Sequence, residues 1–162
     1  MLPTAKNTNL LIFLGCAIAM SVAYYMQYQM GLEPCPLCMT QRIFVMATAL
    51  IALIAFIHAS LGQHYKFYSG FSLLTSVTGG GFSMRQLYLQ SLPPEQAPAC
   101  GPGLGYMLDN FPLMQALEIM LKGDGNCAEV MWIFMGVSIP GWTLVAFTIL
   151  AAISIWQLLR KN

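Results

Sequence analysis

Long apolar runs divide the chain, and its charged side chains are confined to the segments between them. Four runs contain no charged residue, and they cover residues 7–30, 43–65, 67–84 and 130–159. Each is near or above the length of roughly 18 to 20 residues that crosses a bilayer core as a helix. We therefore expect an all-α membrane protein, a bundle of four transmembrane helices at about residues 9–28, 38–59, 65–88 and 142–159.

Two connections on one side of this bundle, at about residues 29–37 and 89–141, are expected to lie outside the membrane. The second is far longer than the loops of roughly 4 to 6 residues usual in compact domains, and long loops tend to be functional. Prolines and glycines between Pro93 and Gly105 predict a mobile strip around Cys100. Apolar residues then recur at helical spacing from Leu113 to Lys122, which predicts a short interfacial helix lying on the membrane surface.

Composition supports this class of protein. Hydrophobic residues make up 57% of the chain and charged residues 8%, which is too few charges to cover a water-soluble domain. The net charge of +1 gives no sign of nucleic-acid binding. We expect residues 1–162 to form a single integral membrane domain, with the first apolar run kept as an anchor because it is too long for a signal peptide and lacks a small-residue cleavage site.

Basic residues predict the orientation. Lys6, Lys66, Arg160 and Lys161 lie in segments that four crossings place on one side, and basic residues mark the cytoplasmic side. Both termini are therefore expected in the cytoplasm. Four cysteines then lie on the outer side, where disulfides persist, and only Cys16 lies within a span.

Cys35 and Cys38 form a C-x-x-C pair in a setting that favours reactivity. Pro34 and Pro36 remove backbone donors, so a helix is expected to begin only at about Leu37 or Cys38. Cys38 then lies in the first helical turn, with Arg42 one turn later on the same face. The unpaired amides of that turn and the Arg42 charge both favour a thiolate at Cys38.

A C-x-x-C pair is also compatible with a metal site, a haem link or a structural disulfide. Met39 stands where haem attachment needs histidine, and Cys100 and Cys127 are too far apart to form the second pair of a zinc site, so we expect no metal. A disulfide across two residues adds little stability, which favours a redox role for Cys35 and Cys38. A Cys100 to Cys127 bond closes a larger loop and fits either role.

Further residues accompany these cysteines at specific positions. They are Pro34-Cys35-Pro36-Leu37-Cys38 with Arg42, Cys100 after a proline-rich strip, and Cys127-Ala128-Glu129 followed by Trp132, Phe134, Gly136, Pro140 and Trp142. Over nearly its whole length the chain resembles the disulfide bond formation protein DsbB family, inner-membrane thiol oxidases of Gram-negative bacteria that depend on quinone. It departs from the pattern at Pro36, where valine occurs in the family, and at Arg85-Gln86, where a histidine near the quinone is expected.

The resemblance implies a bacterial inner-membrane location with the cysteines in the periplasm, and a route for electrons. A reduced DsbA-like periplasmic protein of thioredoxin fold attacks Cys100, and this frees Cys127. Cys127 then swings back to attack Cys35, and Cys38 passes the electrons to the membrane quinone pool, either ubiquinone or menaquinone. All four cysteines are thus expected to be catalytic.

On the quinone side, the resemblance implies that Arg42 binds the cofactor, with Arg85 or Gln86 across the pocket. Two other classes of protein stay open at this point. One is a membrane thiol reductase relay, which should carry a thiol pair within its helices or on the inner face, where this chain has only Cys16. The other is a non-enzymatic four-helix protein with two structural disulfides.

Overall fold

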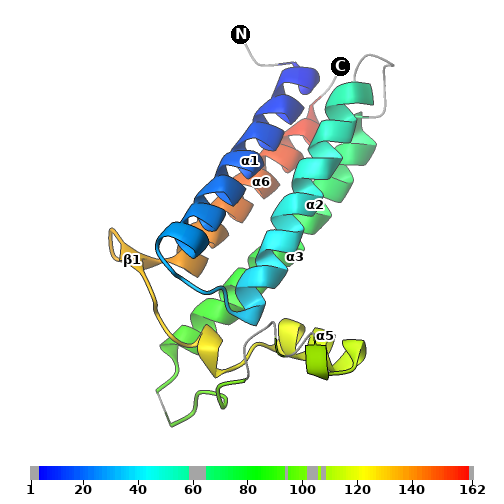
Figure 1. The fold of residues 1–162 in the computed structure, drawn as a ribbon. Coiled ribbons are helices and arrows are strands. Elements are labelled where there is room, and N and C mark those ends of the chain that lie inside the picture. Colours follow the sequence, from blue (N-terminus) through cyan, green and yellow to red (C-terminus); the bar gives the residue numbers. More distant parts are fainter. Residues whose placement is uncertain (1–3, 59–64, 94, 102–105, 107–108, 161–162) are drawn as a thin grey trace.

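The computed structural model describes residues 4–58, 65–93, 95–101, 106 and 109–160. Its long helices are α1 (Ala5–Gln29), α2 (Pro36–His58), α3 (Tyr65–Ser91) and α6 (Ile139–Leu159). They run side by side with both chain ends at one end of the bundle (Figure 1). At the other end lie α5 (Leu113–Lys122), the 3-10 helix η2 (Gly125–Cys127) and a hairpin of β1 (Ile133–Phe134) and β2 (Val137–Ser138).

The long helices lie where the apolar runs predict them, and their ends follow local chemistry. Thr4 caps α1 by accepting a hydrogen bond from the Asn7 backbone N–H at 3.3 Å. α2 begins at Pro36, slightly earlier than predicted, because proline fits the first turn, where no backbone donor is needed. The predicted end of that helix at residue 59, and residues 94 and 102–105 of the strip around Cys100, lie outside the described residues.

Neighbouring helices contact one another in the order α1, α2, α3 and α6. The most extensive contact is between α3 and α6, and Gly79 leaves room there for a buried ring. A Cβ on Gly79 would lie 2.4 Å from Phe147, whose side chain is 1% exposed. The small residues of α3 therefore let the two backbones come close, as in helix pairs within membranes.

Polar side chains link the helices inside this apolar bundle. Ser154 donates to Ser72 at 3.2 Å, and the Thr48 and Thr75 hydroxyls lie 2.8 Å apart. Buried polar groups need such partners, since an unpaired one costs roughly 1 to 3 kcal/mol. Of the described helices, α1, α2 and α6 are long and apolar enough to cross a membrane, whereas α3 is long but richer in serine, threonine and glycine. The chain is thus a helical membrane protein.

Helix α5 occupies the predicted residues, Leu113–Lys122, and lies against the start of α2. The Thr40 hydroxyl donates to the Met120 carbonyl at 3.0 Å, and Arg85 Nε donates to the Lys122 carbonyl at 2.7 Å. Leu113 and Met114 are 72% and 79% exposed, so the described residues leave this part of the apolar face of α5 largely uncovered. Its contact with a membrane surface stays a prediction.

Candidate functional site

Three of the four predicted redox cysteines lie together at the end of the bundle that carries α5. Cys35 precedes α2 and Cys38 lies in its first turn, with a Sγ to Sγ distance of 2.9 Å. Cys127 ends η2, is fully buried, and packs against Cys35, Leu37 and Leu89. None of the five cysteines is in a disulfide in this structure. The sequence predicts that Cys127 has to swing back to Cys35, whereas the structure already places it there.

The contact between Cys35 and Cys127 gives the two sulfurs different proton affinities. A hydrogen bond from the Cys35 thiol lowers the pKa of Cys127, and the Leu37 backbone N–H lowers it further, although burial opposes both. Hydrogen bonding to Cys127, then to Cys38, and then burial raise the pKa of Cys35. Cys127 is therefore the sulfur of this pair that becomes a thiolate first, and the thiolate is the nucleophile in disulfide exchange.

Cys100 is exposed, and the turn that ends at Cys127 is hydrogen-bonded to the segment that carries Cys100. The Gly125 backbone N–H donates to the Ala99 carbonyl at 3.1 Å, and Asn126 Nδ2 donates to the Gly101 carbonyl at 3.1 Å. Glycine is required at position 125, since a Cβ there would lie 2.4 Å from the Pro98 carbonyl oxygen. The fold thus joins an exposed cysteine to the segment that carries a buried one.

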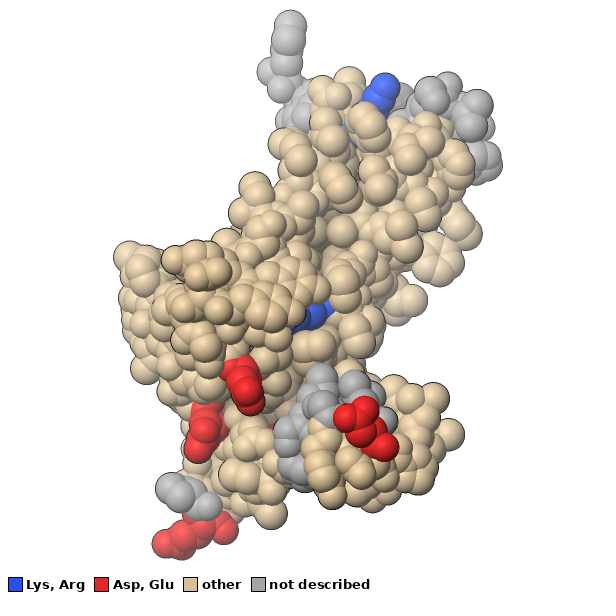
Figure 2. Space-filling model, viewed as in Figure 1, with Lys and Arg blue, Asp and Glu red and all other residues tan. Residues whose placement is uncertain are grey.

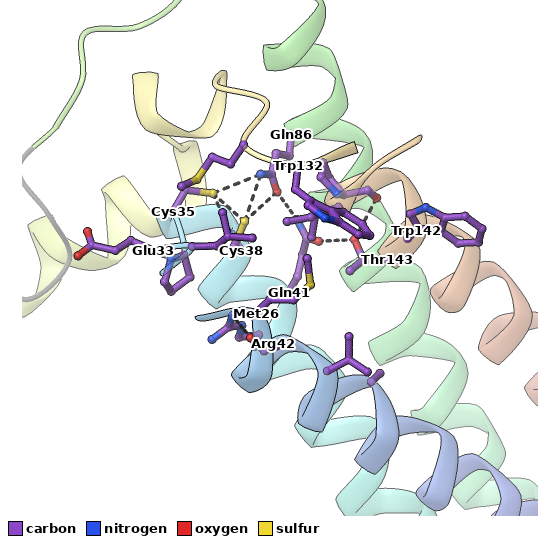
Figure 3. Close-up of a pocket in the computed structure, with 18 of the residues that line it drawn as sticks. Met26, Glu33, Cys35, Cys38, Gln41, Arg42, Gln86, Trp132, Trp142 and Thr143 are labelled. Carbon is purple, nitrogen blue, oxygen red and sulfur yellow. Dashed lines mark hydrogen bonds between the residues drawn. The ribbon is translucent and has the colours of Figure 1, made fainter. Parts of the chain in front are cut away.

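Gln86 of α3 lies beside the Cys35 and Cys38 sulfurs (Figure 3). Its Nε2 donates to Cys35 Sγ at 3.3 Å and to Cys38 Sγ at 3.2 Å. On its other side, Gln86 Oε1 accepts from Gln41 Nε2 at 2.7 Å, and Gln41 Oε1 accepts from the Thr143 hydroxyl at 2.6 Å. The dithiol is therefore the end of a hydrogen-bonded row that crosses from α6 through α2 to α3.

A cavity of about 390 Å³ opens beside Cys38. Its walls come from α1, α2, α3, α6 and the segment before α6, and apolar side chains make up most of them. Trp132 and Phe134 line one wall with their rings stacked at 5.7 Å between centroids. The polar residues that line the cavity include Gln86, which donates to Cys38 Sγ, and Arg42.

The two arginines of the sequence prediction lie in different places. Arg42 lines the cavity and holds α2 to α1, since its guanidinium donates to the Gln27 side chain and, at 3.2 Å, to the Ala23 carbonyl. Arg85 is not among the cavity-lining residues and instead binds the Lys122 carbonyl of α5. Of the pair Arg85 and Gln86, the geometry therefore favours Gln86.

Two site residues, Gln41 and Thr143, are absent from the sequence prediction. Gln41 follows Cys38 by three residues, and that spacing places both side chains on one face of a helix, so the helical period could have shown it. Thr143 has no comparable local signal, because it is far from the cysteines in sequence and reaches the site only through the contact between α6 and α3.

A partly buried dithiol beside an apolar cavity in a helical membrane protein is the arrangement of a membrane-bound disulfide oxidoreductase. The chain belongs to the family of the disulfide bond formation protein DsbB, whose model matches residues 5–157. It is 54% identical to Disulfide bond formation protein B of Saccharophagus degradans over 99% of this chain and 96% of that protein. The protein of the same name from Nitrosococcus oceani is 47% identical, over 93% and 90% of the two chains. Membership in this family assigns the chain to disulfide bond formation.

Proposed function

We propose that this protein reoxidises a DsbA-like dithiol protein of the periplasm through Cys100, Cys127, Cys35 and Cys38, and passes the electrons to a membrane quinone. The observation that carries the proposal is the position of Cys35. It has Cys127 on one side and Cys38 on the other, and Cys38 borders the cavity. Electrons that reach Cys127 therefore have a path of direct sulfur contacts to the cavity.

The first exchange takes place at the exposed cysteine. A partner thiolate attacks Cys100 Sγ in a Cys100–Cys127 disulfide, forms a mixed disulfide and releases Cys127 as a thiolate. The second thiol of the partner then attacks the mixed bond, which leaves the partner oxidised and Cys100 reduced. Cys35 is in a disulfide at this stage and has no proton to donate, so the Leu37 backbone N–H is the group that would stabilise the released Cys127 thiolate.

The second exchange moves the electrons inward. The Cys127 thiolate attacks Cys35 in a Cys35–Cys38 disulfide, so a Cys35–Cys127 bond forms and Cys38 leaves as a thiolate beside Gln86 Nε2. Cys100 then attacks Cys127, which restores the Cys100–Cys127 disulfide and leaves Cys35 and Cys38 reduced. A bound quinone supplies the two-electron oxidant that returns this dithiol to the disulfide.

The residues around the cavity fit a quinone. Small-molecule sites have volumes of roughly 300 to 1,000 Å³ and mostly apolar walls with a few polar groups, and this cavity has both properties. Arg42 makes two hydrogen bonds to α1, which leaves other N–H groups of its guanidinium for a quinone oxygen. We assign Arg42 and Gln86 to hold the polar ring, and the apolar walls to hold the ring faces and tail.

We further propose that α1, α2, α3 and α6 all cross the bacterial inner membrane as one domain of residues 1–162, with both termini in the cytoplasm. The loops at about residues 29–37 and 89–141 are then periplasmic, and the apolar face of α5 lies on the membrane surface. Acidic side chains gather at the α5 end of the molecule (Figure 2), which agrees with this orientation. Serine and threonine hydroxyls of α3 donate within the helix or to α6, so few of its polar groups need water.

The experiment combines the purified protein, a reduced DsbA-like protein and a water-soluble quinone, and follows quinone absorbance. We expect quinone to be reduced only when the purified protein and the reduced DsbA-like protein are both present. One partner disulfide should form for each quinone reduced. If the partner stays reduced while the cysteines remain oxidised, the protein is not a thiol oxidase and its disulfides are structural.

A trapping variant tests the order of exchange. The variant is mixed with the oxidised partner, whose disulfide the Cys100 thiolate can attack. We expect Cys127→Ser to accumulate a covalent complex through Cys100, seen as a heavier band that disappears with reductant. The double variant Cys100→Ser with Cys127→Ser is the control and should give no complex. A complex that forms through Cys35 would overturn the order.

A further inference from the structure

The amide of Gln86 has an NH₂ end and a carbonyl end. The end that lies toward the sulfurs determines whether the amide donates a hydrogen bond to them or accepts one. Its side chain is 3% exposed, and its Nε2 lies within hydrogen-bond distance of both Cys35 Sγ and Cys38 Sγ. The NH₂ group donates to a thiolate or a disulfide sulfur. The carbonyl oxygen repels a thiolate and can only accept the proton of a thiol. Rotation of this amide by half a turn therefore reverses its effect on the dithiol.

Gln41 determines the orientation of the Gln86 amide from the side away from the sulfurs. Gln41 Nε2 donates to Gln86 Oε1 at 2.7 Å, which holds the carbonyl oxygen on the Gln41 side. This oxygen lies 3.6 Å from Cys38 Sγ, whereas Nε2 lies nearer to that sulfur, at 3.2 Å. Gln41 is itself 3% exposed, so solvent can pair with little of its side chain in another orientation. Its own Oε1 accepts from the Thr143 hydroxyl at 2.6 Å. Figure 3 shows these side chains in a row that ends at the dithiol.

The Thr143 hydroxyl has a choice of acceptors. Its choice determines which way each hydrogen bond in the row is donated. The Pro140 carbonyl oxygen lies 2.9 Å from Thr143 Oγ1, and the Ser83 hydroxyl, which can donate or accept, lies 3.3 Å from it. If the single hydroxyl proton went to Pro140, Thr143 Oγ1 would accept from Gln41, and both amides would be turned. Gln86 would then present its oxygen to the sulfurs. Donation from Thr143 to Gln41 is thus what keeps the NH₂ group of Gln86 on the cysteine side.

We propose that Thr143 and Gln41 are positioning residues that hold the Gln86 amide with its NH₂ group toward the Cys35–Cys38 pair, and that they make its disulfide easier to reduce. The proposal rests on the proposed function only in taking these two cysteines as a redox pair. A hydrogen bond to a charged group stabilises it more than one to a neutral group, so a thiolate at Cys38 gains from the donation.

Charged and titratable groups around the pair come from several elements. Arg42, Glu33 and Glu129 line the same cavity, and Cys127 packs against Cys35. A substitution at Thr143 leaves all four in place. A shift measured on replacing Thr143 is therefore due to the row of amides and not to a change of charge.

The test measures the reduction potential of the Cys35–Cys38 pair in the full-length protein, with Cys100 and Cys127 replaced by serine so that one disulfide titrates. Thr143→Val keeps the side-chain shape and removes the hydroxyl. We expect the equilibrium constant for reduction to fall about tenfold, which lowers the potential by about 30 mV. The pH profile of Cys38 alkylation should move to higher pH in the same variant.

Two matched variants separate orientation from packing. Thr143→Ser restores the hydroxyl and should return the potential to that of the parent. Thr148→Val makes the same change on an exposed threonine of α6 whose hydroxyl donates only to the Leu144 carbonyl, and should leave the potential unchanged. An unchanged potential in Thr143→Val, or an equal fall in Thr143→Ser, would overturn the proposal.

A third variant keeps the test valid if Thr143→Val folds poorly. Gln86→Leu removes the amide, and we expect Thr143→Val to have no further effect on the potential in that background. Gln41→Leu in the parent should lower the potential as Thr143→Val does, and no change would count against the proposal. Neither quinone nor partner is present in these titrations, so a failure of the proposed function appears in the turnover assay and a failure of this inference appears here.

Discussion

Gly125→Ala offers a direct test of how the exposed cysteine is held to the buried one. The added Cβ would lie 2.4 Å from the Pro98 carbonyl oxygen, 2.8 Å from the Cys100 backbone N and 3.0 Å from the Ala99 carbonyl carbon. All three atoms belong to backbone, which cannot turn aside as a flexible side chain can. The segment that carries Cys100 must therefore separate from the turn that precedes Cys127.

The cost follows from the bonds that join the two segments. Separation breaks the bond from Gly125 N–H to the Ala99 carbonyl and the bond from Asn126 Nδ2 to the Gly101 carbonyl. At about 1 kcal/mol for each, the segment loses about 2 kcal/mol of docking energy. This corresponds to about a 30-fold lower effective concentration of Cys100 at Cys127. The Cys100–Cys127 disulfide then becomes easier to reduce, by about 40 mV.

The assay uses the full-length protein with Cys35 and Cys38 replaced by serine, so that only the Cys100–Cys127 disulfide titrates. The protein is equilibrated with thiol redox buffers, and the fraction of reduced cysteine is measured by alkylation. Gly81→Ala is the matched control, because a Cβ there meets nothing within 4 Å. We expect the Gly125→Ala potential to rise and the Gly81→Ala potential to match the parent. Equal potentials in the parent, Gly125→Ala and Gly81→Ala would refute the docking of the Cys100 segment on this turn.

Three further predictions address the sulfurs and the cavity. Arg42→Met should raise the apparent KM for quinone several-fold while partner binding is unchanged, and an unchanged KM would limit Arg42 to its bonds with α1. Cys38→Ser should abolish quinone reduction while the Cys100–Cys127 disulfide still reacts once with partner, and repeated turnover would exclude Cys38 as the sulfur next to quinone. The lowered pKa of Cys127 predicts that its stabilising effect on the reduced protein is complete above its ordinary pKa of 9.0 and is lost as the pH falls through the folded value. Denaturant titrations of the reduced protein and of Cys127→Ser should therefore differ more at pH 9 than at low pH.

The sequence predicted the positions of the long helices because their signals are local. Apolar runs and prolines determine where such helices begin and end, and the structure agrees to within a few residues, apart from the end of α2 outside the described part of the chain. The chemistry of Cys35 and Cys38 was also local, since a C-x-x-C pair at a helix start is visible in ten residues. The position of Cys127 beside Cys35 was not, because it depends on how a long loop folds back on α2 and α3.

The sequence could have shown which of Arg85 and Gln86 faces the predicted quinone pocket. Neighbouring residues on a helix point about 100° apart, so only one of them can face the bundle. Gly79 and Ser83 precede Gln86 at helical spacing, and all three are buried on the face of α3 that meets other helices. Arg85 lies off that stripe and reaches α5. The row of small residues already indicated Gln86.

In the proposed route, the exchange at Cys35 moves one negative charge from the Cys127 sulfur to the Cys38 sulfur. Each of these sulfurs has an N–H donor beside it. Cys127 receives the Leu37 backbone N–H at the start of α2, and Cys38 receives Gln86 Nε2. Cys35 lies between them and is bonded to Cys38 before the exchange and to Cys127 after it, so the central sulfur carries no charge while the charge passes from attacker to leaving group. Burial makes an unpaired charge costly at either end, and it therefore confines the charge to the two sulfurs that have donors. Removal of either donor should slow the exchange in the direction that places the charge on that sulfur, because the thiolate formed there is left without a partner.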